Sequence, residues 1–370
     1  MKQGVSRLAQ RAGATLLLAA CTYTGEGENP TATAPDEVEE SDTSTDASTS
    51  TSTSGDPLPQ VTSTDASDTS SGEPTSTTSD GTTGDDTTGT TGGTTGGTKT
   101  CKKVDFLFMI ENESEMAVAY KELGELFPHV AERVETELSD WDYHMMVING
   151  DGNWGTAACE ERCALTGSCE PLLDGYPCEY DPNSCDMTLG AGVTFPAGSW
   201  ASNVQCPIEG DQRYIVNGQP DLAGTLDCLR WVGNSGDTYR KPVQSVLEAV
   251  SPELNGPGAC NEGFIRDDAY QVIMVITTSG DFTTTGTPEE WADSLLAIHG
   301  GKFDKVFLIG LFNDGYYTGT CGTLGAPYTI KNLLGWIDGI FHSSWGSVCE
   351  NDFRPYIDQA LDYILSDCEE

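Results

Sequence analysis

The feature that most constrains this chain is the largely apolar run 103–110 and the acidic stretch that follows it. A run of strand length without a polar face is typical of a strand buried on both sides of a parallel sheet. Glu111, Glu113 and Glu115 follow at every second position, directly before a helical pattern over 117–138. In open α/β sheets, ligands bind beyond the carboxyl ends of the strands. The three glutamates are therefore candidates for a binding site.

Strands and helices alternate along the rest of the chain. Apolar runs predict strands over 143–148, 270–276 and 305–312, and amphipathic spacing predicts helices over 222–232, 242–250, 329–341 and 353–366. The sequence Thr287-Pro-Glu-Glu290 predicts a further helix, because it combines a capping box with proline at the first helical position. This order predicts an α/β fold with a mostly parallel, doubly wound sheet and helices on both faces.

Residues 1–21 have the features of an export signal, with basic residues before an apolar core too short to span a bilayer. The ending Leu18-Ala-Ala-Cys21 resembles the lipobox of bacterial lipoproteins. The resemblance implies a lipid anchor on Cys21, and Thr22 in place of an aspartate favours the outer membrane. The alternative is an ordinary cleaved signal with an incidental cysteine.

Residues 22–100 are dominated by Thr, Ser, Gly, Asp and Glu, with one aromatic and one basic residue against 15 acidic ones. Such a segment cannot bury enough apolar surface to offset the entropy lost on ordering. It is expected to be a disordered, extended linker that holds the domain at 101–370 away from a membrane.

The domain at 101–370 is strongly acidic, with 43 Asp and Glu against 14 Lys and Arg. This balance argues against nucleic acid as a partner, because phosphate binding needs positive charge. Cations or basic surfaces are compatible partners. A solvated acidic surface without a ligand is the alternative.

Twelve of the 13 cysteines lie in the domain, and no two are spaced as Cys-x-x-Cys. An even number in an exported chain predicts six disulfides. Seven of the twelve lie between Cys159 and Cys228, around a segment at about 151–218 that is rich in Gly, Pro, Asn and Asp. This segment is expected to be a cross-linked insertion without a core of its own.

The sequence Val104-Asp-Phe-Leu-Phe-Met-Ile-Glu-Asn-Glu-Ser-Glu-Met116 resembles the first strand and metal-site loop of a von Willebrand factor type A domain. The stretches 268–277, 306–311 and 346–353 are similar to a group of bacterial surface lipoproteins with such domains. The resemblance covers most of the domain outside the insertion. It implies a Rossmann-like fold that binds a divalent cation and a partner protein at the strand ends.

The resemblance also implies which residues form that site. Glu111, Glu113 and Glu115 occupy the first loop, Thr238 the second and Asp281 the third. An all-oxygen set suits Ca²⁺ or Mg²⁺. Because glutamates are longer than the Asp and Ser of the family, binding is expected to be weak, with a dissociation constant on the order of 10⁻⁴–10⁻³ M. The alternative is a metal-free loop whose glutamates face water.

Two disulfides are expected outside the insertion, the first implied by the resemblance to this fold and the second by the order of the predicted elements. The two ends of such a domain lie near each other, which favours Cys101–Cys368, and Cys321 and Cys349 flank one predicted helix. The remaining eight cysteines would then stabilise the insertion.

Enzyme motifs are scarce, since the chain lacks Gly-x-Ser-x-Gly and His-Glu-x-x-His and has four histidines, each expected to be structural or solvated. The favoured interpretation is a non-enzymatic binding or adhesion module on the cell envelope, with an unknown protein or cell-surface ligand. The alternatives are a secreted hydrolase with its site in the insertion and a structural spacer without a specific ligand.

Overall fold

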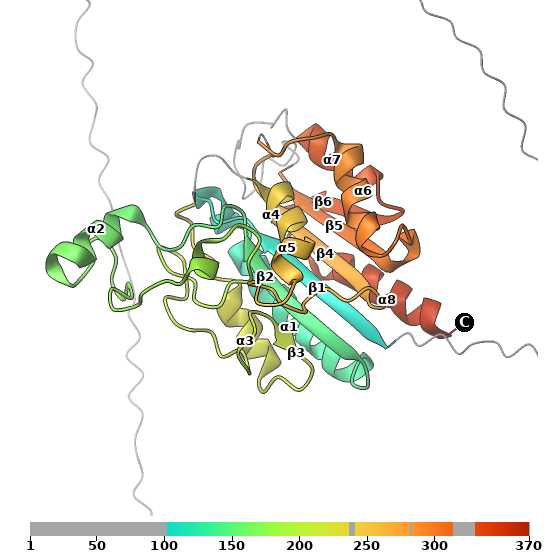
Figure 1. Ribbon diagram of the computed structural model, residues 1–370, viewed down its shortest axis with the longest axis horizontal. Helices are drawn as coiled ribbons and strands as arrows, with labels where there is room; N and C mark the ends of the chain where they lie inside the picture. Colours follow the sequence, from blue (N-terminus) through green and yellow to red (C-terminus); the bar gives the residue numbers. More distant parts are fainter. Residues whose placement is uncertain (1–101, 237–240, 282, 314–329, 370) are drawn as a thin grey trace, which may run out of the picture. The chain divides into compact units, whose positions relative to one another are not determined.

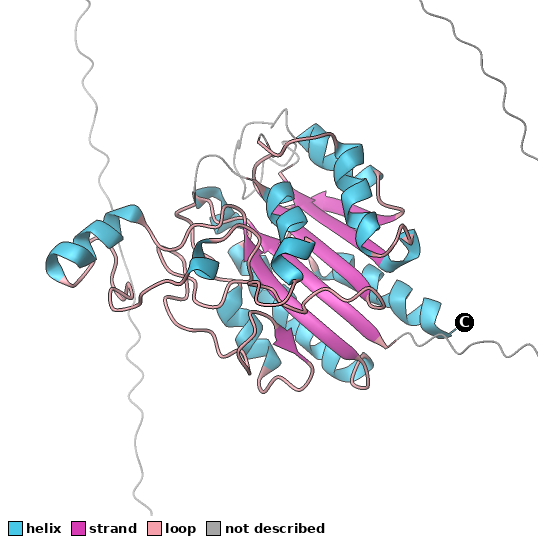
Figure 2. Cartoon of the chain, viewed as in Figure 1, coloured by secondary structure: helices cyan, strands magenta, loops and turns pink. Residues whose placement is uncertain are grey.

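The computed structural model describes residues 102–236, 241–281, 283–313 and 330–369. Within these ranges a six-stranded sheet has the order β3-β2-β1-β4-β5-β6 (Figures 1 and 2). The parallel strands are β1 (Lys103–Ile110), β2 (Asp142–Asn149), β4 (Tyr270–Thr277), β5 (Val306–Phe312) and β6 (His342–Ser347). The edge strand β3 (Ile215–Val216) is antiparallel to β2. The predicted α/β fold with a mostly parallel sheet is confirmed.

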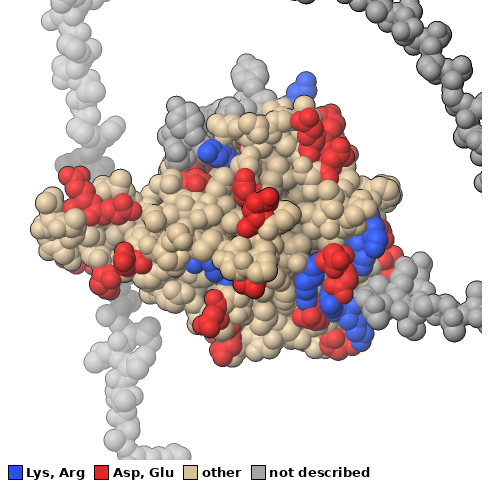
Figure 3. Space-filling model, viewed as in Figure 1, with Lys and Arg blue, Asp and Glu red and all other residues tan. Residues whose placement is uncertain are grey.

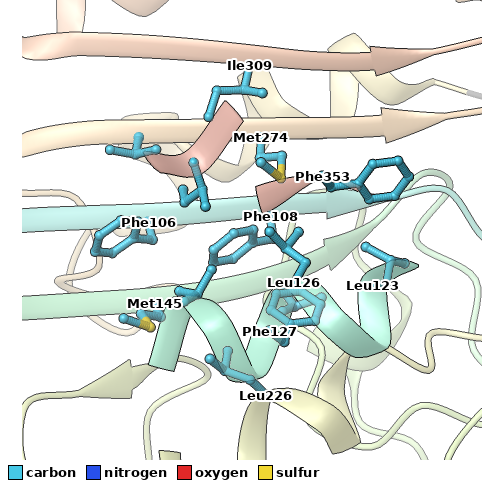
Figure 4. Close-up of a cluster of buried hydrophobic side chains, with 14 of the residues drawn as sticks. Phe106, Phe108, Leu123, Leu126, Phe127, Met145, Leu226, Met274, Ile309 and Phe353 are labelled. Carbon is cyan, nitrogen blue, oxygen red and sulfur yellow. The ribbon is translucent and has the colours of Figure 1, made fainter. Parts of the chain in front are cut away.

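Helices cover both faces of the sheet, as the buried strands require. One face packs against α1 (Tyr120–Glu137), α3 (Leu222–Leu229) and α8 (Arg354–Glu369), and the other against α4 (Pro242–Ala249), α6 (Pro288–Ile298) and α7 (Ile330–Asp338). Alternation along β1 supplies both cores, because Phe106 and Phe108 face α1 while Leu107 and Met109 face α4. Figure 4 shows Phe108 beside Phe127 of α1, with ring centroids 5.1 Å apart.

Local signals placed most elements correctly and missed two strands. The capping box at Thr287 and Glu290 is present at the start of α6. The strands β3 and β6 were not predicted, because β3 has two residues and β6 reads His-Ser-Ser-Trp-Gly-Ser without an apolar run. The helix expected over 117–138 is divided into the 3-10 helix η1 (Ser114–Val118) and α1.

The cysteine-rich segment contains α2 (Ala157–Thr166), the 3-10 helix η2 (Ser184–Met187) and also β3, so it contributes to the sheet as well as to the surface. Figure 1 shows α2 apart from the sheet. Two short elements complete the described chain, α5 (Pro252–Asn255) and η3 (Phe303–Lys305).

Four disulfides pair the eight cysteines expected to stabilise this segment. They are Cys159–Cys169, Cys163–Cys178, Cys185–Cys260 and Cys206–Cys228. The first two close loops within the insertion, and the last two join it to the segment after α5 and to α3. The disulfide-rich insertion is therefore confirmed, but the expectation that it lacks a core is wrong, because Cys159, Cys169, Tyr176 and Ala197 form a small buried cluster within it.

The two other expected disulfides each include a residue outside the described ranges, namely Cys101 and Cys321. Cys349 takes part in a disulfide. Cys21, the expected lipidation site, and the linker 22–100 also lie outside the described residues. No helix in the described part of the chain is both long and apolar enough to cross a membrane.

Candidate functional site

The strand order reverses between β1 and β4, so the loops at the carboxyl ends of these two strands lead to opposite sides of β1. The chain passes from β1 to β2 on one side and returns to β4 on the other side of β1. Loops leaving such a pair diverge, which makes this point the usual ligand site of an open α/β sheet. The loop after β1 carries the three glutamates, and the loop after β4 carries Asp281.

Glu111 joins these two loops. Its side chain is 1% exposed, and one carboxylate oxygen accepts hydrogen bonds from the backbone N–H and the hydroxyl of Thr278, at 2.7 and 2.8 Å. The other oxygen accepts a hydrogen bond from the Ser279 hydroxyl. The Glu111 N–H in turn donates to the carbonyl of Ile276 at 3.0 Å. Glu111 therefore holds the first loop against the third.

Glu113 and Glu115 have different positions from Glu111. Glu113 is buried at the N-cap of η1, and its carbonyl accepts a hydrogen bond from the Met116 N–H at 3.0 Å. Glu115 is half-buried within η1 and accepts a hydrogen bond from the Ser114 hydroxyl at 2.9 Å. The alternation expected for an extended segment is lost here, because the chain turns into a 3-10 helix at Ser114.

Asp281 caps a helix from a different loop. One carboxylate oxygen accepts from the backbone N–H of Val243 at 3.0 Å and the Thr284 hydroxyl at 2.6 Å. The other accepts from the backbone N–H groups of Thr283 and Thr284 at 3.1 and 2.9 Å. Because Val243 is in the first turn of α4, the carboxylate satisfies a free N–H at the positive end of the helix dipole.

Thr238 lies outside the described residues, but the residues on either side of its loop are placed. The N–H of Gly236 donates to the carbonyl of Asn112 at 2.8 Å, and the N–H of Lys241 donates to that of Gly150 at 3.1 Å. A side chain at Gly236 would meet Asn112 at 2.7 Å, so this close approach requires glycine. Both flanks of the second loop therefore contact the loops after β1 and β2.

The carboxylates of Glu111 and Asp281 are both engaged by donors of the protein. Both oxygens of each carboxylate accept hydrogen bonds from the protein, and Ca²⁺ or Mg²⁺ would have to displace several of them to complete an oxygen shell. Among the described residues, no group of three or more Asp, Glu, His or Cys side chains is placed to hold a metal. Cation binding at this site stays a prediction.

An exposed tryptophan beside this site was missed from the sequence. Trp200 is 48% exposed, and its ring stacks on Tyr120, with centroids 5.7 Å apart. The Tyr120 hydroxyl donates to the carbonyl of Gly233 at 2.6 Å, and Asn234 donates to the carbonyl of Ser199 at 2.9 Å. A single tryptophan in an aperiodic loop gives no signal in the sequence, so only the fold places it here.

Tyr120, Trp200 and Trp231 form an aromatic group, and the buried Arg230 contacts two of its members. The Arg230 guanidinium lies 4.0 Å from the centroid of the Trp231 ring and donates to the carbonyl of Tyr120 at 3.0 Å. Burial raises the pKa of Tyr120, Arg230 lowers it, and the negative charge of Glu111 raises it again. The aromatic group and the acidic loop are therefore close enough to interact electrostatically.

The histidines make structural contacts away from the first and third loops. His129 contacts Asp358 between α1 and α8, His144 bonds the carbonyl of Phe264, His299 bonds Gln271, and His342 packs on Tyr363. Burial lowers the pKa of His144, His299 and His342, which favours their neutral form. None of these contacts pairs a histidine with a serine or cysteine nucleophile.

No family model and no curated protein matches the chain.

Proposed function

We propose that this chain is a non-enzymatic binding module of the von Willebrand A type, held on the cell envelope by a lipid on Cys21. Its ligand, a protein or another cell-surface molecule, would contact the loops at the carboxyl ends of β1 and β4. The observation that carries this proposal is the exposed, conformationally strained Trp200 beside the acidic loop.

The backbone of Trp200 supports a binding role. Its φ is +60°, a left-handed conformation that costs a bulky L-residue roughly 1–3 kcal/mol. The loop is held in this form by the side chain of Asn203, which bonds the N–H and the carbonyl of Gly198 at 2.8 and 3.1 Å. The bridge between Ala201 and Val232 holds it further. The strain leaves a large aromatic ring half exposed, and tryptophan is enriched among residues that dominate binding energy.

The charge around Trp200 favours a basic partner. Glu113 and Glu115 lie in the segment that leads into α1, whose first residue, Tyr120, contacts Trp200. The domain also has a large excess of acidic residues. Complementary charge raises association rates and excludes acidic partners. An exposed aromatic ring on a strongly acidic domain is suited to a partner that carries Lys or Arg around an apolar patch.

Binding of cell-envelope fragments to the immobilised mature chain tests this proposal. We expect Trp200→Ala to weaken binding by roughly tenfold or more, as for a central tryptophan contact. Trp345→Ala is the matched control, because Trp345 is 46% exposed and lies in the edge strand β6, which is separated from β1 by β4 and β5. The proposal is wrong if wild type does not bind, or if both variants bind like wild type.

A hydrolase site in the insertion, the alternative function, would need a nucleophile and a base in a cavity there. The larger cavity described there is lined by aromatic, proline, alanine, methionine and disulfide-bonded cysteine residues and by Glu160. The lining, taken over the described residues, includes no histidine or serine that could form a nucleophile and base.

A further inference from the structure

The insertion contains an open cavity of about 400 Å³ that is separate from the loops proposed above. Its walls include Trp154, Tyr176 and Tyr180, the disulfide Cys163–Cys178 and the side chain of Glu160. Small-molecule sites in proteins occupy roughly 300–1,000 Å³ and are mostly apolar with few polar groups. The cavity has the size and lining of a ligand site.

The three aromatic rings form one continuous wall. The Trp154 ring centroid lies 5.2 Å from that of Tyr180 and 5.9 Å from that of Tyr176. Their polar atoms are already engaged within the insertion. The Trp154 indole N–H donates to the carbonyl of Phe195 at 2.8 Å, and the Tyr180 hydroxyl donates to Asp186 at 2.8 Å. The rings therefore offer a ligand their π-systems rather than hydrogen bonds.

Disulfides fix this wall before any ligand arrives. Cys163–Cys178 joins α2 to the segment that carries Tyr176 and Tyr180, and Cys159–Cys169 closes the loop beside it. The Tyr176 hydroxyl also accepts a hydrogen bond from the N–H of Thr156 at 3.3 Å. A site with little freedom to lose binds its ligand at a smaller entropic cost.

The charge of the cavity is negative. Glu160 is the one charged residue among those that line it, and its carboxylate lies beside the Tyr176 hydroxyl. Both groups lie next to Gly155: a Cβ added there would be 3.6 Å from the Glu160 carboxylate and 2.1 Å from the Tyr176 hydroxyl. Residues 151–190 contain eight acidic residues and one basic residue, Arg162. Figure 3 shows acidic side chains over the part of the surface that carries α2.

We propose that this cavity binds a methylated ammonium group, the cation of choline and related compounds. The faces of Trp and Tyr attract such a cation through the ring quadrupole, and a carboxylate adds to the attraction. A metal ion or a primary ammonium group would need several oxygen acceptors, and the lining supplies one carboxylate with two tyrosine hydroxyls. The inference does not depend on the proposed function at the strand ends.

Calorimetric titration of the mature chain with choline chloride tests this site. The neutral isostere 3,3-dimethylbutan-1-ol has the same shape without the charge, and we expect it to bind at least roughly tenfold more weakly. Glu160→Gln, a change at an exposed position that preserves the wall, is expected to weaken choline binding by up to about fivefold. Trp154→Ala is expected to abolish it.

Trp200→Ala and Trp345→Ala are the controls, and both should bind choline like wild type because neither residue lines the cavity. Phosphatidylcholine vesicles tested alongside free choline show whether a lipid headgroup can also enter. The proposal is overturned if choline does not bind, if the neutral isostere binds equally well, or if Glu160→Gln and Trp154→Ala both bind like wild type.

Discussion

Glu111 accepts two hydrogen bonds from one residue, the backbone N–H and the hydroxyl of Thr278, at 2.7 and 2.8 Å. The two residues are 167 positions apart in the chain. Their contact joins the loop after β1 to the loop after β4, at the point where the strand order reverses. A carboxylate with only acceptor oxygens matches the donors that face it.

Glu111→Gln is expected to destabilise the domain by roughly 1–3 kcal/mol, because the amide group would direct a donor at the donors of Thr278 or Ser279 in a buried site. Urea unfolding measures the change. The matched control is Glu115→Gln at a half-buried position, expected to change stability by less than about 0.5 kcal/mol. Equal effects of the two substitutions would contradict the bridging role of Glu111.

Divalent cations are expected to bind the mature chain no more tightly than about 10⁻⁴ M. The reason is that Glu111 and Asp281 would have to give up hydrogen bonds to backbone N–H groups before contacting an ion. Calorimetry with Ca²⁺ and with Mg²⁺ measures the affinity. Micromolar binding that disappears in a Glu113→Gln, Glu115→Gln double variant would show that the acidic loop is a metal site after all.

Asp105 is expected to make stability depend on pH. Burial raises its pKa to about 7, although hydrogen bonds from Arg266 at 2.6 and 2.9 Å oppose the shift. The pKa of an unperturbed Asp is 3.8, so between about pH 4 and pH 7 the folded chain holds a proton that the unfolded chain has lost. The contribution of this group to stability therefore falls as pH rises through that window.

Unfolding free energies of wild type and Asp105→Asn at several pH values measure this effect. Wild type should lose up to about 4 kcal/mol more than the variant between pH 4 and pH 7, by conversion of the pKa shift. Comparing the slopes of unfolding free energy against pH removes any effect of the substitution that does not depend on pH. Parallel pH profiles for the two proteins would mean that Asp105 does not titrate in this range.

Membrane association is expected to depend on Cys21. The lipobox-like Leu18-Ala-Ala-Cys21 motif supplies the proposed anchor, because acylation adds hydrocarbon that partitions into a bilayer. Cys21→Ser should move the protein from the detergent phase to the aqueous phase, while Thr22→Ala should leave its partition unchanged. A serine variant that still partitions into detergent would refute the anchor.

Much of the fold follows from local patterns. The strands at the centre of the sheet are apolar over strand length, and Thr287 and Glu290 mark the start of α6 within four residues. Hydrophobic periodicity and helix capping can be read from the sequence, because both depend on residues only a few positions apart. The edge strands β3 and β6 lack such signals, since an edge strand buries less of its surface.

The candidate site depends less on local sequence patterns than the fold does. The sequence placed Glu111 and Asp281 at the correct end of the central strands, because the carboxyl ends of parallel strands lie on the same side of a sheet. The prediction that both belong to one ligand shell stays a prediction, and the structure adds that Asp281 caps α4 through Val243. The sequence also offered no reason to select Trp200, whose position depends on its packing against Tyr120.

By itself the sequence determined the α/β class, the buried strands, most helix positions and the presence of a disulfide-rich segment. Only the tertiary structure decided which donors each buried carboxylate meets, how the cysteines of the insertion pair with one another, and which aromatic rings line a cavity. The physical reason is distance along the chain. Hydrophobic periodicity is a property of residues close together in the sequence, whereas the contacts Glu111–Thr278 and Cys185–Cys260 join residues 167 and 75 positions apart.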